Sequence, residues 1–463
     1  MLNVLSQKSL TRGLQPDDLN RFHFYAKKVR VLGSPSSEDE HGLHHLVLPI
    51  ISSHRQGSGA LLPNILDLVV KLKDFEGMAI LPSLVVGPRL QSIVIQFPLP
   101  RSTLAAYPWD NVRSVLTGSL SSILAFTIAS SARYDPVFRV PGNISDLVHS
   151  MPNLQLLSAP MLEFDHASLS RFATLPNFRT LRISTKSEDL HQYLLSPLRF
   201  RSLGYLDLVT DGLAACTQFL REHDLKQLSM LIIYLRSGHA HNFDPLLERL
   251  SHDGSTSILT AVDISRCVSG SPQAFGMPVI TPTTIAYILP FNNLQCVTLS
   301  LDGSVNLDSA TVMLMATSWP HLHILSLKER TTDTIPHVKL GDLAHFTTFC
   351  PDLLSLAIRV NALALPEHAD VGNVIPGRKL RCFDACTSPI DINEHFSVTR
   401  FLAMMFPAIT TLQHSWDNDH LPDHPSEYSA AWEMVCRGMN RIIQHNRNVL
   451  GGRDLHSRTP IVG

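Results

Sequence analysis

The sequence predicts an α/β solenoid: short parallel strands form a curved sheet on the concave side, helices line the convex side, and helical caps close both ends. Three observations support this prediction. The apolar pattern L-x-x-L-x-L recurs along most of the chain, a proline often stands just before it, and a helix-compatible run precedes most copies. Two adjacent copies span Trp319–Leu327 and Cys350–Ile358.

The proline before each copy has a physical role. Pro320 and Pro351 cannot continue a preceding helix, and each disfavours helical geometry in the residue before it. The apolar residues that follow alternate with other residues, as a half-buried strand requires. The same punctuation precedes Ile65, Leu154, Phe178 and Ile409.

The spacing of the copies identifies the type of solenoid. The first apolar residues of the predicted segments lie 24 to 35 residues apart. This period overlaps and somewhat exceeds the roughly 20–29 residues of leucine-rich repeats, which leaves room for a helix in each unit. We therefore expect a leucine-rich-repeat solenoid over 59–416, a helical N-terminal cap and linker over 1–58, and a C-terminal capping helix with a flexible tail over 417–463. The first apolar residues are Ile65, Leu90, Ile123, Leu154, Phe178, Leu203, Leu228, Leu259, Leu294, Leu322, Leu353, Leu380 and Ile409.

Composition narrows the function classes. The chain has 463 residues, of which 44% are hydrophobic and 17% charged, so it is an ordered protein. A net charge of −2, with no basic block longer than Lys27-Lys28, argues against nucleic-acid binding. The sequence shows neither a signal peptide nor an apolar run of the roughly 18 residues that span a bilayer. The seven scattered cysteines do not suggest a disulfide framework, and we expect a cytoplasmic or nuclear location.

The first predicted element is a helix within residues 1–32. Asp17 is its expected N-cap, and Phe22, Tyr25, Ala26 and Val29 fall on one face. This face is expected to cover the open end of the solenoid, with docking of a partner helix as the alternative. A polar loop follows, and the apolar segment 43–51 is expected to complete the cap.

Helices are predicted between the strands. Four have an aspartate as the expected N-cap: Asp165, Asp211, Asp244 (followed by Pro245) and Asp308. The apolar stripes behind them predict core positions, as do Leu343, Phe346 and Phe349 and, further on, Val398, Phe401, Leu402 and Met405. Residues 266–280 are rich in glycine and proline and predict an inserted loop. The last predicted helix covers 426–446, with Tyr428, Trp432, Val435, Met439 and Ile442 on one stripe and a disordered tail from Gly451.

No motif for catalysis or cofactor binding is present: the sequence lacks a dinucleotide fingerprint, a phosphate loop, a zinc-protease helix and a nucleophile elbow. The loop 414–424 holds three histidines and three carboxylates, but Pro422 prevents His420 and His424 from sharing a helix face. We expect a polar loop there rather than a metal site, and free thiols at Cys382 and Cys386. The protein is predicted to be non-enzymatic, with no cofactor. The alternative is an enzyme with its groups in 266–280 or 414–424.

The residues that alternate with the core positions are expected to point onto the concave sheet. Exposed Met, Ile, Tyr and Arg on such a face favour binding of a protein, because large apolar surfaces are costly unless covered. The alternative is a solvated sheet face with no partner. The predicted partner-binding residues are Arg182, Tyr205, Asp207, Tyr234, Asp263, Lys328, Arg359 and Asp384.

Residues 17–30 contain Arg21-Phe22-x-x-Tyr25-Ala26-x-x-Val29-Arg30. This stretch resembles the segment that follows the F-box in fungal (basidiomycete-type) F-box/leucine-rich-repeat proteins, and the Pro-x-hydrophobic strand starts such as Cys350–Leu353 resemble the repeats of that family. The resemblance implies the substrate-binding part of a ubiquitin-ligase adaptor.

The F-box itself, a helical segment that docks a Skp1-type adaptor, is expected to be missing, since only 16 residues precede Asp17. A Skp1-type adaptor is therefore an expected partner only if an F-box exists upstream. Otherwise the chain is a free-standing scaffold for a protein partner of unknown identity, with neither nucleic acid nor membrane as a partner.

Overall fold

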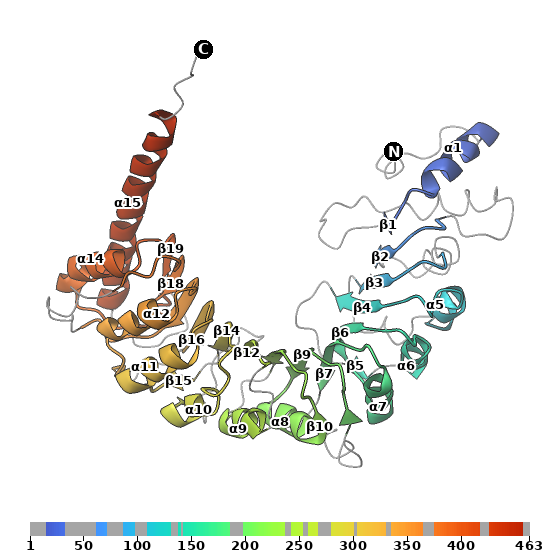
Figure 1. Cartoon of the computed structure of the whole chain (residues 1–463), viewed down its shortest axis with the longest axis horizontal. Coiled ribbons are helices and arrows are strands. Elements are labelled where there is room, and N and C mark those ends of the chain that lie inside the picture. Colours follow the sequence, from blue (N-terminus) through green and yellow to red (C-terminus); the bar gives the residue numbers. More distant parts are fainter. Residues whose placement is uncertain are drawn as a thin grey trace. The chain divides into compact units, whose positions relative to one another are not determined.

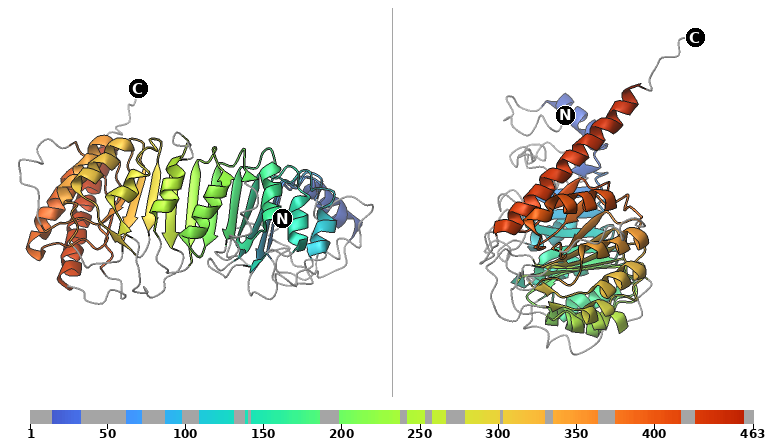
Figure 2. Two further views of the ribbon diagram at one scale, coloured as in Figure 1. Left: turned by 90° about the horizontal axis from the view of Figure 1, so that it is seen from below. Right: turned by 90° about the vertical axis from the view of Figure 1, so that its left-hand side faces the viewer.

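The computed structural model describes residues 15–32, 62–71, 87–97, 109–130, 138–139, 142–185, 198–236, 242–252, 258–266, 279–300, 303–329, 335–363, 375–416 and 426–456. The chain divides into two compact units. Unit 1 comprises Met1–Thr210 and Glu222–Gln227, and unit 2 comprises Asp211–Arg221 and Leu228–Gly463. Each unit contains a parallel sheet with helices along one of its faces (Figures 1 and 2).

In unit 1 every strand of the main sheet is parallel to its neighbour. The helices are α1 (Pro16–Ala26), α5 (Trp109–Leu116), α6 (Gly142–His149) and α7 (His166–Thr174). The short β5 (Phe138–Arg139) pairs with the end of β6, and β8 (Leu198–Arg199) pairs with β10 (His223–Asp224). The strand order is β1 (Val31–Leu32), β2 (Asp67–Lys71), β3 (Ser92–Phe97), β4 (Ala125–Ser130), β6 (Leu156–Glu163), β7 (Thr180–Thr185) and β9 (Tyr205–Thr210).

Unit 2 repeats the same arrangement, again with parallel pairing throughout. Its strand order is β11 (Met230–Leu235), β12 (Ala261–Arg266), β14 (Cys296–Ser300), β16 (Ile324–Lys328), β17 (Ser355–Ile358), β18 (Cys382–Asp384) and β19 (Thr411–Gln413), and β13 (Val279–Ile280) pairs separately with β15 (Ser304–Val305). The helices are α8 (Leu213–Glu222), α9 (Asp244–His252), α10 (Pro282–Ala286), α11 (Ser309–Ser318), α12 (Ala344–Phe349), α14 (His395–Met405) and α15 (Ser426–His456), with the short η3 (Leu340–Leu343) and η4 (Ile392–Glu394) leading into α12 and α14.

A proline turn leads into several strands. The backbone N–H of Leu322 donates to the carbonyl of Trp319, and that of Leu353 donates to Cys350, each at 3.1 Å. This bond closes a four-residue turn, and proline stands at its second position, where its fixed φ is favoured. The recurrent Pro-x-Leu signal is therefore a turn that ends one helix and starts the next strand.

The predicted repeat register is confirmed. A strand begins two residues after every one of the thirteen first apolar residues, and all thirteen are buried. The next core position forms a continuous ladder in each unit: Leu68, Ile93, Phe126, Leu157, Leu181 and Leu206 in unit 1, and Leu231, Val262, Val297, Leu325, Leu356 and Phe383 in unit 2. Each strand thus buries its apolar side against its two neighbours and the helices behind them.

The helices supply the other side of the core. The predicted stripes are buried in α7, α8, α9, α11 and α14, but Phe349 of α12 is 38% exposed. Phe349 is the last residue of that helix, whereas Phe346, one turn earlier, is buried. Asp165 and Asp308 are N-caps as predicted, accepting the backbone N–H of Ser168 and Thr311. Asp244 differs: α9 begins at Asp244 itself, and the Asn242 side chain accepts its N–H.

The N-terminal helix begins earlier than predicted. Its N-cap is Gln15, not Asp17, because Pro16 occupies the first helical position and the Asp18 carboxylate closes the turn on the Gln15 N–H at 2.9 Å. Of the expected covering face only Ala26 is buried; Tyr25 is 43% exposed. The expected cap segment 43–51 lies outside the described residues.

The C-terminal helix is longer than predicted. α15 continues from Ser426 to His456, through Gly451, where we expected a disordered tail. Its stripe of Trp432, Val435 and Met439 is buried, as expected for a cap, and α14 packs beside its first turns (Figure 1). None of the helices in the described part of the chain is both long and apolar enough to cross a membrane.

Candidate recognition surface

Each sheet has a face that points away from the helices, which we call the open face. It carries the residues that alternate with the buried ladder. In unit 2 the register sets two rows across this face, and adjacent strands about 4.8 Å apart make each row continuous. The first row is Ile232, Asp263, Thr298, Ser326, Ala357, Asp384 and Gln413, and the second is Tyr234, Ser265, Ser300 and Lys328.

Two predicted residues form an ion pair across unit 2. Lys328 Nζ lies 2.8 Å from Asp384 Oδ2, with side chains 45% and 7% exposed. Lys328 on β16 lies in the second row and reaches Asp384 of the first row on β18 by crossing β17, where Ala357, the neighbour of Asp384 in the register, has a small side chain. Burial lowers the pKa of Lys328, but the hydrogen bond and the charge of Asp384 raise it by more, so the amine stays charged.

A similar pair lies on the open face of unit 1. Arg182 Nε is 2.9 Å from Asp207 Oδ2, and the two residues are direct neighbours in the register of β7 and β9. The Asp207 side chain is only 2% exposed, whereas that of Arg182 is 42% exposed. Arg182 thus forms the accessible part of the pair, beside the half-buried Tyr205.

Asp263 differs from these two aspartates. It is half-buried on β12 and accepts a hydrogen bond from the Ser265 hydroxyl. Burial raises its pKa, and the bond from Ser265 offsets this only in part. Its charge in turn adds to the burial that raises the pKa of the neighbouring Cys296 thiol. Within the described residues, no charged group contributes to the pKa shift of Asp263.

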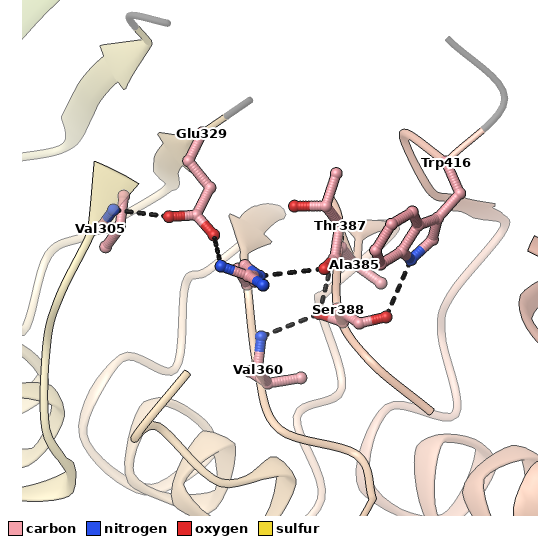
Figure 3. A network of polar contacts seen from close by, with 8 residues as sticks. Val305, Glu329, Val360, Ala385, Thr387, Ser388 and Trp416 are labelled. Carbon is pink, nitrogen blue, oxygen red and sulfur yellow. Dashed lines mark hydrogen bonds and ion pairs between the residues drawn. The ribbon is translucent and has the colours of Figure 1, made fainter. Parts of the chain in front are cut away.

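Arg359 is not on the accessible surface, contrary to our expectation. Its side chain is 3% exposed, and its Nη1 lies 2.6 Å from Glu329 Oε1, whose side chain is fully buried. Arg359 Nε donates to the Thr387 carbonyl at 3.0 Å, and Glu329 Oε2 accepts the Val305 N–H at 2.5 Å. Figure 3 shows Glu329 between Val305 and the segment that carries Thr387. Arg359 follows the last residue of β17, so it joins the chain segments beyond the strand ends instead of facing a partner.

The same segment anchors the C-terminal cap. The Ser388 hydroxyl accepts the Val360 N–H at 2.8 Å, and the Ser388 carbonyl accepts the indole N–H groups of Trp416 and Trp432 at 2.9 and 2.8 Å. Figure 3 shows the bonds of Ser388 to Val360 and Trp416. Cys386 has φ of 52°, in the left-handed region, and its N–H donates to the Asp384 carboxylate at 2.9 Å. The predicted site residue Asp384 is therefore also part of a rigid, buried turn.

Glu329 and Ser388 were missed by sequence reasoning. Glu329 stands immediately after the last residue of β16, as Arg359 stands after β17, and opposite charges after adjacent parallel strands are the signal that could have paired them. Ser388 offered no comparable pattern, since its partners lie 28 and 44 residues away.

The loop 414–424 is described only as far as Trp416, so His420 and His424 lie outside the described residues. Over the ranges given above, no group of three His, Cys, Asp or Glu side chains is placed to hold a metal. The described cysteines, which include Cys382 and Cys386, are free thiols.

Comparisons with known proteins give low similarity. No family model and no curated protein matches the chain. An internalin from Listeria monocytogenes is similar at 13% identity and a TM-score of 0.37, covering 89% of this chain and 96% of its own. A chain of the yeast Rad7 and Elc1 complex is similar at 11% identity and a TM-score of 0.34, covering 88% of this chain and 92% of its own. The leucine-rich-repeat protein LegL7 from Legionella pneumophila has 10% identity and a TM-score of 0.25, covering 89% and 97%.

At these values the fold assignment depends on the geometry of the chain itself. Parallel strands in sequence order, a proline turn before several of them and helices on one face define an α/β leucine-rich-repeat solenoid.

Proposed function

We propose that the chain is a non-enzymatic recognition protein that binds a partner protein on the open faces of its sheets. The observation that carries this proposal is the contrast between the two faces: helices cover one, while the other presents part-exposed Tyr205, Arg182, Tyr234 and Lys328 among hydroxyl side chains. Tyrosine and arginine supply much of the energy in protein interfaces. A rigid sheet also costs little entropy to order on binding.

The competing surface is the helical side of unit 2. Met313 of α11 is 47% exposed. On α14, Phe396 near the start of the helix is 76% exposed and Met404 near its end is 48% exposed. Single exposed apolar residues are common on soluble proteins. These residues therefore serve as the matched controls for the open face.

Affinity capture from an extract of the native cells tests the proposal. Tyr205→Ala and Tyr234→Ala are expected to reduce the recovery of one specific protein by about tenfold or more each, as truncation of an interface anchor does. Met313→Ser and Phe396→Ser are expected to leave the recovery unchanged. Loss of the partner with the helix-side variants alone would overturn the proposal. Circular dichroism melting curves establish that all four variants remain folded.

The finer proposal is that this recognition serves a ubiquitin ligase, in the cytoplasm or nucleus, as in fungal F-box/leucine-rich-repeat proteins. The support is local: Arg21-Phe22-x-x-Tyr25-Ala26-x-x-Val29-Arg30 covers the C-terminal half of α1 and leads directly into β1. In addition, Arg30 Nη1 donates to the Asn64 carbonyl, and Asn64 Nδ2 donates to Lys27 O, which ties this stretch to the first repeat.

Pull-down with a Skp1-type adaptor tests the ligase link. We expect a product of the same gene that carries an upstream helical F-box segment to bind the adaptor, and the 463-residue chain alone not to bind it. If no such product binds, the free-standing scaffold is the better description. A measured activity that depends on His420 or His424 would instead favour the enzyme alternative.

A further inference from the structure

The three aspartates among the predicted partner-binding residues lie on the open faces, and they differ in how their charge is balanced. Asp207 is paired with Arg182, and Asp384 is paired with Lys328. Asp263 accepts only the neutral hydroxyl of Ser265 in the described residues, and no ion pair joins it to a cation there. It is nevertheless half-buried, so its carboxylate has lost part of its hydration without gaining a counter-charge.

The neighbours of Asp263 suit an organic cation. Tyr234 on β11 pairs in register with Ser265, so it stands diagonally across from Asp263 on the same face of two adjacent parallel strands. An aromatic ring beside a carboxylate favours ammonium and guanidinium groups through cation–π attraction. Thr298, next to Asp263 in the same row, adds a hydroxyl that can accept a hydrogen bond from such a group.

A metal ion fits this place less well. Calcium and magnesium require several oxygen ligands arranged around the ion, and calcium sites generally draw on several carboxylate and carbonyl oxygens. Asp263 is the one carboxylate among the row positions of β11, β12, β14 and β16, and the described residues bring no other metal ligands together.

We propose that Asp263 is the anchor for a lysine or arginine side chain of the partner protein, which lies across β11, β12 and β14 with its cation between Asp263 and Tyr234. This inference rests on the proposed function. The cation restores to Asp263 the counter-charge that Arg182 and Lys328 supply to the other two aspartates. Binding therefore gains specificity for a basic residue at one position and rejects an acidic residue there.

A random dodecapeptide display library, selected on the full chain, tests the assignment. We expect a fixed lysine or arginine in the selected peptides. A synthetic copy is expected to bind Asp263→Asn at least about 30-fold more weakly by fluorescence anisotropy, the usual result of removing one partner of a desolvated charge pair. Exchange of the two charges, with Asp263→Lys and glutamate in the peptide, is expected to recover much of the affinity.

Two further variants make the outcomes distinct. Asp352 lies in the turn before β17, away from the open-face rows, and its carboxylate pairs with Lys379. Asp352→Asn removes this charge and is expected to leave peptide affinity unchanged. If Tyr234→Ala weakens peptide binding and Asp263→Asn does not, the assignment of Asp263 is wrong while the proposed function stands. If no selected peptide depends on any open-face residue, the proposed function fails as well. Asp263→Asn is nearly isosteric, and its melting temperature shows that it is folded.

Discussion

Arg359 and Glu329 show why a charged residue beside a strand is not necessarily a recognition residue. Burial raises the pKa of Glu329, and the charge of Arg359 lowers it again in part. Taking both groups out of water costs several kcal/mol each, so the pair is stable only because each member also binds backbone groups. Its role is to fix the segments beyond β16 and β17.

We predict that Arg359→Met lowers the free energy of unfolding by about 3–5 kcal/mol, because Glu329 is left buried without a counter-charge. Adding Glu329→Gln is expected to recover part of this loss, since the neutral amide keeps an acceptor for the Val305 N–H. Urea denaturation followed by circular dichroism measures both.

The control for this prediction is Lys379→Met. Lys379 and Asp352 form an ion pair with side chains 58% and 39% exposed, and such pairs contribute about 0–1 kcal/mol. An equal loss of stability from Lys379→Met and Arg359→Met would contradict the role given to burial.

Asp263 gives a prediction of pH dependence. Because burial raises its pKa in the folded protein, the folded state binds this proton more tightly than the unfolded state does. Its contribution to stability is therefore present below the ordinary value of 3.8 and is lost as the pH rises through the raised pKa. Relative to wild type, Asp263→Asn is expected to gain in melting temperature from acidic to neutral pH. A relative loss over that range would mean that the fold stabilises the carboxylate.

At the scale of single elements, α11 shows how a repeat starts its helix. The Asp308 carboxylate accepts hydrogen bonds from both the hydroxyl and the backbone N–H of Thr311. These bonds hold the pKa of Asp308 below its usual range, and the hydroxyl bond has the larger effect. The helix itself is apolar on most sides, so its start is set by this cap more than by a polar face.

We predict that Asp308→Ala lowers stability by about 1 kcal/mol at neutral pH, whereas Asp308→Ser retains most of it. Because the folded pKa is depressed, the contribution of Asp308 is present above 3.8 and disappears as the pH falls through its folded pKa. The gap in melting temperature between wild type and Asp308→Ala should therefore close in acid. A gap that is independent of pH would indicate a role other than capping by the carboxylate.

The strands could be predicted from the sequence because one local rule recurs in every repeat. An apolar residue such as Leu322 or Leu353 stands two residues before each strand, and it can be recognised from the local sequence. Predicting the strand start from it requires no knowledge of distant residues. Arg359 could not be placed, because its burial depends on Glu329 and on the segment at Thr387. The predicted end of the last helix near Gly451 depended only on the low helix propensity of glycine. In the structure α15 continues past Gly451 to His456.

At the scale of the whole molecule, each strand packs mainly against its immediate neighbours in the sheet and the helices behind them. We predict that Leu325→Ala in β16, a fully buried position, costs about 2–5 kcal/mol and raises amide hydrogen exchange first in β14, β16 and β17. Exchange in β3 and β4 of unit 1 is expected to change much less. Leu157→Ala in β6 should give the reverse pattern, and equal exchange everywhere after either change would mean that both units unfold together.

The bond that Trp416 and Trp432 share at the Ser388 carbonyl also makes the chain a fluorescent reporter of its own C-terminal end. Of its four tryptophans, Trp109 belongs to unit 1 and the other three belong to unit 2. With Trp109 and Trp319 changed to phenylalanine, the remaining emission comes from two buried indoles that the same carbonyl holds. Detachment of α15 would then appear as a red shift in emission, with no added dye.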